Sequence, residues 1–337
     1  MKIRSLDRPA LLSLVDGFPR QQVVMLGDLV ADEFVLGDIA RVSREAPVLI
    51  LKQRERRILP GGGANAVNNL ADLEARVVPV GVVGEDEAGS GLLTYFQQKN
   101  VTTRNILCRR GYITPTKSRI LGGLAHWQHQ QIVRVDREPA RPLDRQTRRA
   151  LRSRAASLLA KASALLVSDY GYGSTDAREV AALKRPAARR RLPITVDSRF
   201  DLLSYSHLTA ATPNEPEIEE AFGQKIGTDL GLLHRLGRRL LRRMALEALL
   251  VTRGRDGMVL FEPGKDPTHI PVFGSDVAID VTGAGDTVIA VFTLALASGA
   301  SFLQAAQLAN CAGGLVVMKR GTATVSRPEL REAIRNA

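Results

Sequence analysis

Short apolar runs that alternate with helix-like segments constrain the fold of this chain more than any other feature. The runs are almost continuously apolar, as expected of parallel strands that are buried on both faces. This alternation predicts a doubly wound α/β sheet. The runs are Gln22–Asp28, Arg76–Gly84, Ala164–Gly171, Leu192–Ser198 and Ala248–Gly254, and the helix-like segments include Gly63–Ala75, Arg145–Ala162 and Pro216–Gly223.

Polar residues and glycines follow several of these runs, at the points where the strands would end. Ligands of doubly wound sheets bind outside the carboxyl ends of the strands. We therefore expect the functional site at this edge of the sheet. The residues there are Gly27, Asp28, Asp169, Asp197, Thr252, Arg253 and Gly254.

Two segments show a different pattern. Ala46–Gly61 and Thr116–Glu138 alternate apolar and polar residues, most clearly over Ile132–Asp136, which is typical of strands with one face in water. They predict a small accessory sheet, or lid, with strands drawn from about residues 34–60 and 112–138. Because the sequence shows no convincing linker, we expect a single domain over residues 1–337.

The composition is typical of a soluble globular protein. Of 337 residues, 45% are hydrophobic and 24% are charged, which predicts a sizeable core. No run approaches the ~20 apolar residues that span a bilayer, and nothing at the N-terminus resembles a targeting signal. The two cysteines, Cys108 and Cys311, lie far apart and form no metal-like pair. These features favour a cytoplasmic protein.

The net charge of +12 has two interpretations. A basic surface attracts nucleic acid, anionic lipid or a phosphorylated substrate. The arginines are nevertheless dispersed over helix-like stretches at 145–154, 184–191 and 234–244, and no nucleic-acid recognition motif accompanies them. We favour solvated helix faces and expect neither nucleic acid nor a membrane as partner.

The segment DVTGAGDT, at Asp280–Thr287, precedes an apolar run that predicts a buried helix ending near Gly299. The free N–H groups and the dipole at the start of a helix form an anion site. Asp286, in the first turn, could accept a proton from an attacking hydroxyl. Phosphoryl transfer requires this combination of donors and base. In isolation, an Asp that only complements the helix dipole is the simpler interpretation.

The chain resembles the ribokinase-like (PfkB) family of carbohydrate kinases over nearly its whole length. DVTGAGDTVIAVF resembles the second signature of the family, and PGGGANAVNNLADLEARVVPVGVVGEDEAG, at Pro60–Gly89, resembles the first. VVMLGDLVADEF resembles the opening strand, which ends in a sugar-binding Asp. Two separate signatures in the expected order make the resemblance specific. It implies a ribokinase-like three-layer α/β sandwich with a central, mostly parallel sheet and a small β-sheet lid.

The resemblance also implies the roles of residues at the sugar and at the reacting phosphate. Asp286 is the expected catalytic base. A carboxylate and an amide provide the acceptors and donors that vicinal hydroxyls need, although Asp32 and Asn65 would otherwise be taken for a loop cap and a helix start. The expected anion hole is Gly283, Ala284 and Gly285, and the expected sugar ligands are Asp32, Gly62, Gly63, Asn65 and Asp169.

TPNEPEIEEAFG, at Thr212–Gly223, resembles the Asn-x-x-Glu element that organises magnesium in the family. Magnesium retains several waters, so Glu217 could act through water; a helix start is the alternative reading of this segment. Asp280 is expected to order its turn or a monovalent-cation site, such as one for potassium. The expected cofactors are ATP and Mg²⁺. The expected nucleotide-binding residues are Asn214, Glu217, Thr252, Gly254, Gly257 and Asn310. For Asn310, a buried helical amide that hydrogen-bonds to the backbone is the alternative.

Several stretches resemble the branch that phosphorylates D-glycero-D-manno-heptose 7-phosphate. These are GDIARVSREAPVLILK, TPTKSRIL, HQQIVRVDRE and RGTATVS. A substrate that already carries a phosphate needs cations, and Lys117, Arg119 and Arg134, with Asp136 beside them, lie on predicted lid strands. Exposed charge that protects a sheet edge is the alternative. The branch implies transfer to O1, which gives the 1,7-bisphosphate of lipopolysaccharide heptose synthesis, and a homodimer formed through the lid.

Two departures from this branch leave alternatives open. Tyr172 stands where the branch has a lysine. The segment DSRFD, at Asp197–Asp201, stands where the branch has Asp-Pro-Lys, and Arg199 could replace the cation of that lysine. A kinase for another sugar or sugar phosphate, such as ribose, fructose or fructose phosphate, is the first alternative. A catalytically silent binder of nucleic acid or sugar phosphate is the second. Because the sequence ends soon after the kinase-like region, we expect a separate protein to supply the nucleotidyltransferase step of the heptose branch.

Overall fold

The five predicted buried strands lie in one nine-stranded sheet of the computed structural model, which describes residues 7–123, 130–274 and 278–337. The strand order is β13-β12-β11-β10-β9-β8-β1-β4-β5. The pairs β11–β12 and β12–β13 are antiparallel and the others are parallel, which confirms the predicted mostly parallel sheet. The strands are β1 (Gln22–Gly27), β4 (Arg76–Gly84), β5 (Ile106–Arg109), β8 (Ala164–Asp169), β9 (Ile194–Ser198), β10 (Ala210–Ala211), β11 (Ala248–Thr252), β12 (Met258–Phe261) and β13 (Thr268–Ile270).

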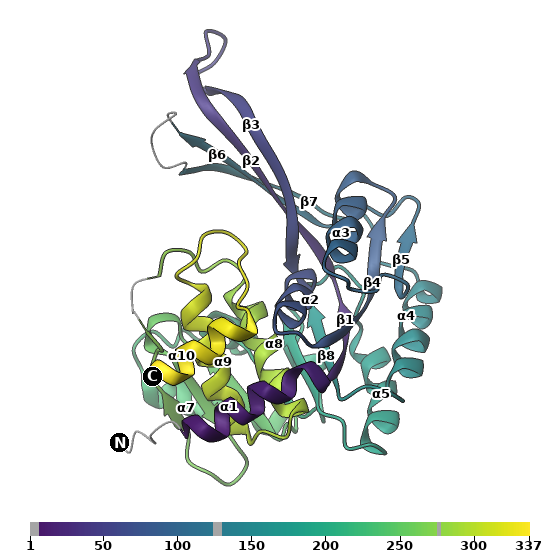
Figure 1. Cartoon of the computed structure of the whole chain (residues 1–337), viewed down its shortest axis with the longest axis vertical. Coiled ribbons are helices and arrows are strands. Elements are labelled where there is room, and N and C mark those ends of the chain that lie inside the picture. The colour runs from purple at the N-terminus through teal and green to yellow at the C-terminus, as the bar shows by residue number, and fades with distance from the viewer. Residues whose placement is uncertain (1–6, 124–129, 275–277) are drawn as a thin grey trace.

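Helices cover both faces of this sheet and give the predicted three layers (Figure 1). On one face lie α1 (Arg8–Gly17), α2 (Gly63–Asp72), α3 (Glu87–Gln98), α8 (Ala284–Ala297), α9 (Phe302–Val316) and α10 (Arg327–Asn336). On the other lie α4 (Arg145–Leu158), α5 (Ala177–Ala188), α6 (Glu215–Phe222) and α7 (Leu230–Arg243). Short 3₁₀ segments are η1 (Phe18–Arg20), η2 (Leu202–Ser204) and η3 (Gly254–Asp256).

The side chains of β1 show why its sequence is continuously apolar. Val23 and Met25 enter the core under α2 and α8, whereas Val24 and Leu26 enter the core under α4. All four are fully or almost fully buried. Each such burial contributes about 1.5–3 kcal/mol, so a polar residue on either face would be costly.

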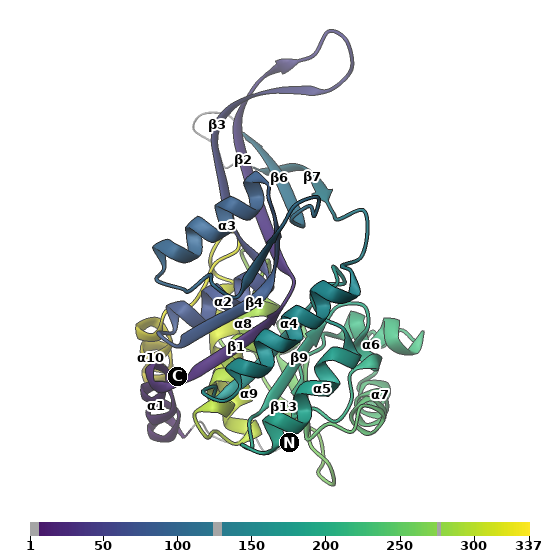
Figure 2. The same cartoon turned by 90° about the vertical axis from the view of Figure 1, so that its right-hand side faces the viewer.

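The second sheet has four strands in the order β3-β2-β6-β7 and extends away from the helical body (Figures 1 and 2). Its strands are β2 (Leu29–Val42), β3 (Leu49–Gly62), β6 (Thr116–Gly123) and β7 (Gln130–Arg137). The predicted accessory sheet is therefore confirmed, although residues 124–129 of the predicted segment Thr116–Glu138 lie outside the described residues. Because only Asp28 separates β1 from β2, this sheet begins at the carboxyl end of β1.

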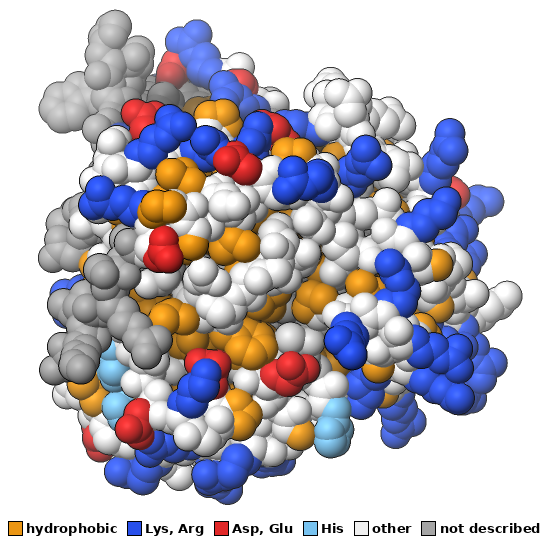
Figure 3. All heavy atoms as spheres, turned by 60° about the horizontal axis from the view of Figure 1, so that its bottom comes forward, with side chains coloured by type: hydrophobic (Ala, Val, Ile, Leu, Met, Phe, Trp, Pro, Cys, Tyr) orange, Lys and Arg blue, Asp and Glu red, His pale blue; other side chains and the backbone are white. Residues whose placement is uncertain are grey.

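Two helices concentrate positive charge, because α4 and α7 each carry five arginines and no acidic residue. Figure 3 shows Lys and Arg side chains around the rim of one face, with hydrophobic side chains nearer its centre. Four arginines of α7 line a shallow hollow, and only one of them, Arg238, forms an ion pair in the part of the chain that the structure describes. Within the described ranges, no helix combines the length and apolar character needed to cross a membrane.

Candidate active site

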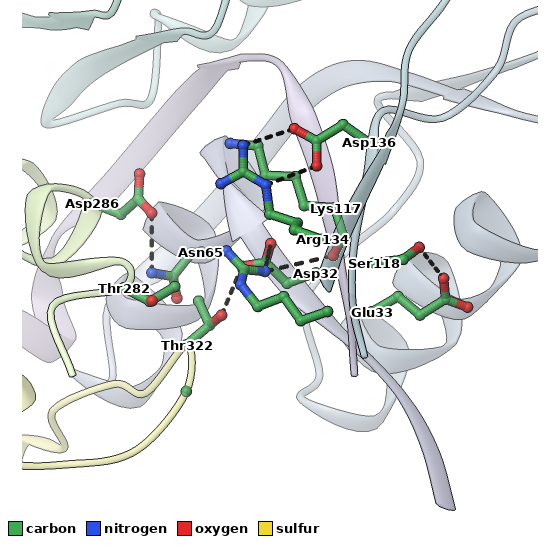
Figure 4. Close-up of polar contacts among 12 residues, drawn as sticks. Asp32, Glu33, Asn65, Lys117, Ser118, Arg134, Asp136, Thr282, Asp286 and Thr322 are labelled. Atoms are coloured by element: carbon green, nitrogen blue, oxygen red, sulfur yellow. Dashed lines mark hydrogen bonds and ion pairs between the residues drawn. The ribbon is translucent and has the colours of Figure 1, made fainter. Parts of the chain in front are cut away.

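Most of the predicted catalytic and sugar-binding residues lie where α8 begins, beside the base of the second sheet. Figure 4 shows Asp286, Asn65, Asp32 and Thr322 close together, with Lys117 of the second sheet nearby. These residues come from α8, α2, β2, the segment before α10, and β6. The fold therefore assembles the site from segments that are far apart in the sequence.

Asp286 lies in the first turn of α8 and exposes 3% of its surface. One carboxylate oxygen accepts a hydrogen bond from the Tyr170 hydroxyl at 2.7 Å, and the other accepts one from the Asn65 amide at 3.1 Å. Burial raises the pKa of Asp286 to about 7, with the charges of Asp197 and Asp32 adding to this effect and the two hydrogen bonds opposing it. A pKa near neutrality suits a general base.

Gly283 shapes the start of α8. Its φ of +78° is in the left-handed region, and a Cβ there would lie 2.5 Å from the amide nitrogen of Asn65. The Asn65 amide also donates to the Gly283 carbonyl oxygen at 3.3 Å. No side chain of the described residues caps this helix. Among these residues the N–H groups of Gly283 and Gly285 have no hydrogen-bond partner, whereas the Ala284 N–H donates to the Val281 carbonyl oxygen at 3.2 Å. Two of the three N–H groups of the predicted anion hole are thus available to an anion.

A buried polar network joins α2 to α8 behind this site. Asn69 donates to the backbone oxygen of Asn65 at 3.0 Å and to its side-chain oxygen at 3.3 Å. Thr287 donates to the side-chain oxygen of Asn69 at 3.0 Å. Satisfied networks of buried polar groups fix side-chain orientation. Asn65 is thereby held with its amide directed at Asp286.

Asp32, on β2, is also buried, and each of its carboxylate oxygens accepts one hydrogen bond from the protein. One oxygen accepts from Arg119 at 2.7 Å, and the other accepts from the Thr322 hydroxyl at 2.7 Å. The Arg119 and Asp32 side chains expose only 12% and 5% of their surfaces. Arg119 is therefore the partner of a carboxylate in this structure rather than an unpaired cation.

The glycines predicted to lie against the sugar have packing reasons of their own. Gly62 has a φ of +52°, and a Cβ there would lie 2.8 Å from Val30 and 3.1 Å from the Tyr170 ring. A Cβ at Gly63 would lie 2.6 Å from the backbone oxygen of Asp28. These contacts let α2 begin close to the junction of β1 and β2, and the predicted contact with a sugar stays a prediction.

The other predicted lid residues lie on paired strands. Lys117 on β6 is opposite Asp136 on β7, and Arg119 is opposite Arg134. The Lys117 ammonium lies 5.1 Å from the centre of the Tyr170 ring. Burial lowers the pKa of Lys117, and Arg199 and Arg134 lower it further, against the opposing charges of Asp32 and Asp286.

Arg134 and Asp136 form an exposed pair. The Arg134 guanidinium makes two hydrogen bonds of 2.9 Å with the Asp136 carboxylate (Figure 4). The two side chains expose 48% and 29% of their surfaces. Exposed pairs of this kind contribute about 0–1 kcal/mol, so Arg134 can leave Asp136 at little cost.

Asp169, the remaining predicted sugar ligand, belongs to a separate cluster at the end of β8. One oxygen accepts from the Ser198 hydroxyl at 2.9 Å and from the Tyr205 hydroxyl at 2.8 Å, and the other accepts from the Gly171 N–H at 3.0 Å. Asp169 also lines a hollow with Gly171 and Tyr205, and its predicted contact with a sugar stays a prediction.

The loop after β8 is organised by Asp28. Its carboxylate accepts from the N–H groups of Tyr170, Tyr172 and Ser174 at 2.9, 3.0 and 2.8 Å. Burial raises the pKa of Asp28 to about 6, and the nearby charge of Asp169 adds to the shift. This buried carboxylate fixes the loop that carries Tyr170 beside Asp286.

The structure shows what surrounds Tyr172 and Arg199, the two residues that depart from the heptose branch. The Tyr172 hydroxyl donates to Glu138 at 3.0 Å, so this side chain joins the loop after β8 to the end of the second sheet. Arg199 lies near the site, since its charge lowers the pKa of Lys117 and also acts on Glu217. Arg199 therefore supplies a cation, whereas Tyr172 does not.

Asn214 and Glu217 lie at the start of α6, where they form a capping box. The Glu217 N–H donates to the Asn214 side-chain oxygen at 2.8 Å, and the Asn214 N–H donates to the Glu217 carboxylate at 2.9 Å. The helix-start reading of this segment is thus correct, and it leaves the carboxylate near Asp197 and Arg199. Burial raises the pKa of Glu217 to about 7 and raises that of Asp197 strongly.

A pair of partly buried carboxylates that repel one another fits a hard divalent cation. Burial and the charge of Glu217 raise the pKa of Asp197, and the nearby charge of Arg199 offsets this only in part. A further cation would therefore stabilise the ionised pair. Oxygen ligands are those that Mg²⁺ prefers. Asp197 and Glu217 would hold the ion, directly or through its waters.

A cleft of about 220 Å³ lies on the other side of the α8 start. It is bordered by η3, α9 and the first turn of α8. The structure brings together here four predicted nucleotide-binding residues, Thr252, Gly254, Gly257 and Asn310, with Ala284 and Gly285 of the predicted anion hole. The Asn310 side-chain amide donates to the Pro271 backbone oxygen at 2.8 Å. The backbone therefore satisfies this amide, as the alternative interpretation of Asn310 predicts.

Asp280 ties the segment before α8 to the segment before α10. One oxygen accepts from the Thr282 N–H and the other from the Gly321 N–H, both at 2.9 Å. Although burial disfavours the charge, these hydrogen bonds hold the pKa of Asp280 below its usual range. The geometry is that of a residue that orders a turn.

Sequence reasoning missed Tyr170 and Thr322 as contacts of the site. Tyr170 was visible only as the residue after the strand-end Asp169, and nothing in the pattern indicates where its hydroxyl points. Thr322 lies in RGTATVS, which resembles the heptose branch. That resemblance was the only signal that this segment reaches the site.

The chain is similar in sequence to known proteins. A family model described as pfkB family carbohydrate kinase matches residues 22–330. The bifunctional protein HldE of Desulfatibacillum aliphaticivorans is 36% identical over 320 residues, which cover 95% of this chain and 64% of that protein. The bifunctional protein HldE of Mesorhizobium japonicum is 39% identical over 316 residues, which cover 93% of this chain and 62% of that protein. The chain thus spans less than two thirds of these relatives.

Solved structures share the fold at low sequence identity. Arabidopsis thaliana ribokinase, complexed with ribose and ATP, matches with a TM-score of 0.70 and 18% identity, over 94% of this chain and 98% of that one. Escherichia coli phosphofructokinase-2, in complex with fructose-6-phosphate, matches with a TM-score of 0.73 and 15% identity over the same fractions. These similarities confirm the predicted ribokinase-like fold.

Proposed function

The chain belongs to the pfkB family of carbohydrate kinases, and we propose that it transfers the γ-phosphoryl group of ATP to O1 of D-glycero-β-D-manno-heptose 7-phosphate. The observation that supports this most directly is the position of Asp286. Its buried carboxylate directly follows Gly285, which lines the cleft together with Thr252, and its charge acts on Lys117, as does that of Asp32. A base in that position can serve a sugar on one side and a nucleotide on the other.

In the proposed reaction, Asp286 accepts the proton of the attacking sugar hydroxyl as the bond from its oxygen to the γ-phosphorus forms. The bond between this phosphorus and the β,γ-bridging oxygen breaks, and ADP leaves. The N–H groups of Gly283, Ala284 and Gly285 donate to the phosphoryl oxygens as charge develops on them. Asp32 orients the sugar through its hydroxyls. Magnesium, held near Asp197 and Glu217, would neutralise phosphate charge. We propose that Asp280 orders the turn, with potassium as an optional neighbour rather than a participant.

The second sheet supports a substrate that already carries a phosphate. Lys117 and Arg134 lie on the same side of this sheet as Arg119, and the HldE relatives share over 90% of this chain at 36–39% identity. Lys117 forms no ion pair with any described residue, and an unphosphorylated sugar would leave it without an anionic partner. Tyr172, which supplies no charge, is the observation that favours a second candidate, a kinase for a different sugar phosphate such as fructose 6-phosphate.

We also propose that two protomers pair through the second sheet in the cytoplasm. Monomeric proteins rarely expose large contiguous apolar patches. A partner sheet would cover the exposed apolar side chains of β2, β3, β7 and the loop between β2 and β3, which are Val42, Val48, Leu49, Ile132, Val133 and Val135. Gel filtration with light scattering should give twice the 36.6 kDa chain mass.

Turnover with a panel of sugars tests the proposed function. Purified chain with ATP and Mg²⁺ is assayed for ADP release with heptose 7-phosphate, fructose 6-phosphate, fructose and ribose, and the products are identified by ³¹P NMR. We expect heptose 7-phosphate to give the highest kcat/KM. Asp286→Asn should lower kcat about 10²–10⁴-fold while sugar binding is retained. Asp266→Asn, at a highly exposed carboxylate, is the matched control.

Two results would overturn the proposal. The first is full turnover by the Asp286→Asn protein, which would remove the base from the mechanism. The second is the absence of turnover with every sugar combined with salt-sensitive nucleic-acid binding, which would favour the silent binder.

A further inference from the structure

We propose that Tyr170 is a positioning residue that keeps the Asp286 carboxylate ionised and oriented for proton transfer. The inference deepens the proposed function, because it concerns the same base. The Tyr170 hydroxyl donates to one oxygen of Asp286 at 2.7 Å, and Asn65 donates to the other at 3.1 Å. With one donor on each oxygen, rotation of the carboxylate breaks at least one hydrogen bond.

The position of the Tyr170 hydroxyl is fixed from behind. The backbone N–H of Tyr170 donates to the buried carboxylate of Asp28 at 2.9 Å, together with two later N–H groups of the same loop. On its other side, the ring packs against the start of α2, where a Cβ at Gly62 would come within 3.1 Å of it. The phenol is therefore presented to Asp286 by a rigid loop rather than by a free side chain.

The direction of the proton in this contact follows from the surroundings. Burial raises the pKa of Tyr170 well above its usual value, and the charge of Asp286 raises it further. Tyr170 therefore remains a donor throughout the working pH range. A hydrogen bond donated to a carboxylate stabilises its charged form and lowers its pKa. Without the phenol, burial would hold Asp286 protonated at a higher pH.

The ring of Tyr170 has a separate contact. The Lys117 ammonium lies 5.1 Å from the ring centre, within the range of a cation–π interaction. Substitution of Tyr170 by Phe keeps this ring and removes only the hydroxyl. The variant therefore isolates the contact with Asp286 from the contact with Lys117.

A titration that needs no substrate tests the inference independently of the proposed function. Protein labelled with ¹³C at aspartate side-chain carboxyls is titrated by NMR, and the Asp286 signal is assigned by its loss in Asp286→Asn. Tyr170→Phe should raise the pKa of Asp286 by about 1–2 units, since hydrogen bonds to charged groups contribute about 1.5–3 kcal/mol. Tyr172→Phe is the matched control, because its hydroxyl contacts Glu138, and it should leave this pKa unchanged.

Kinetics provide the second measurement, with whichever sugar phosphate the enzyme turns over. Because the base acts when deprotonated, a raised pKa moves the acidic limb of the kcat/KM profile to higher pH. Tyr170→Phe should lose about 10-fold or more at pH 6.5 and recover to within about threefold of wild type at pH 9. An unchanged Asp286 pKa in Tyr170→Phe, or a loss of activity that is equal at every pH, would refute the inference. If no sugar is turned over but the pKa shift is observed, the proposed function fails and this inference stands.

Discussion

Two glycines at the start of α8 allow the anion site to be tested by one added methyl group at each. A Cβ at Gly283 would lie 2.5 Å from the Asn65 amide nitrogen and 3.1 Å from Thr322, and the backbone there has a φ of +78°. A Cβ at Gly285 would have no heavy atom within 4 Å, although this residue lines the cleft of about 220 Å³ beside α8. Gly283→Ala should therefore damage the protein, and Gly285→Ala should obstruct only a ligand.

The expected magnitudes follow from these contacts. In Gly283→Ala, the left-handed conformation costs about 1–2 kcal/mol, and displacement of Asn65 from the Asp286 carboxylate costs about 1.5–3 kcal/mol. The sum is about 2.5–5 kcal/mol, or a decrease in Tm of roughly 4–7 °C for a chain of this size. In Gly285→Ala, helix propensity leaves stability unchanged or raises it by up to about 1 kcal/mol.

Thermal unfolding and steady-state kinetics distinguish the two variants. If the amides at the start of α8 bind phosphate, the Gly285→Ala methyl displaces the phosphate by about 1 Å, and kcat/KM for ATP should fall about 100-fold at unchanged Tm. Wild-type kinetics in Gly285→Ala would show that no phosphate approaches this backbone. An unchanged Tm in Gly283→Ala would show that the contact with Asn65 is not a constraint.

Two further predictions concern stability. Arg119→Met leaves the buried Asp32 carboxylate without its ion-pair partner and should lower the free energy of unfolding, measured in urea, by about 3 kcal/mol. Adding Asp32→Leu to this variant should restore more than half of the lost stability. Additive losses from the two substitutions would contradict this prediction. The Nε2 atoms of His234 and His269 are 2.8 Å apart and burial lowers both pKa values, so the unfolded chain binds more protons as pH falls below about 6.5. The stability that this pair contributes is therefore present above that pH and is lost as the pH falls through the folded-state pKa values. His269→Gln should flatten the decline of the urea midpoint between pH 7 and pH 5. A decline equal to that of the wild type would show that other groups cause the acid sensitivity.

The main sheet was largely predictable from sequence because burial on both faces leaves a plain signal. β1, β4, β8, β9 and β11 each coincide with a predicted apolar run. β10 and β13, with two and three residues, are too short to show any period. β2 was harder to delimit, because its first five residues are buried and the rest are mostly partly exposed or exposed, without alternation.

The residues of the site were predictable from sequence only where they belong to a family motif. Asp286, Asn65 and the residues of the nucleotide cleft came from family signatures, and most of them lie together as expected. The contacts of Asp32 with Arg119 and Thr322 join residues that are 87 and 290 positions apart. Sequence patterns describe local periodicity, so they do not indicate which of several cations on a strand will meet a buried carboxylate.

The lid cations differ in their availability to a substrate phosphate, and this difference is energetic. Arg119 is held by Asp32 in a buried pair, and its removal would cost about 3 kcal/mol. Arg134 is held by Asp136 in an exposed pair that contributes at most about 1 kcal/mol. Lys117 forms no ion pair with any described residue, and its ammonium lies 5.1 Å from the centre of the Tyr170 ring. A sugar phosphate should therefore engage Lys117 first and Arg134 next, while Arg119 continues to orient Asp32 toward the sugar hydroxyls.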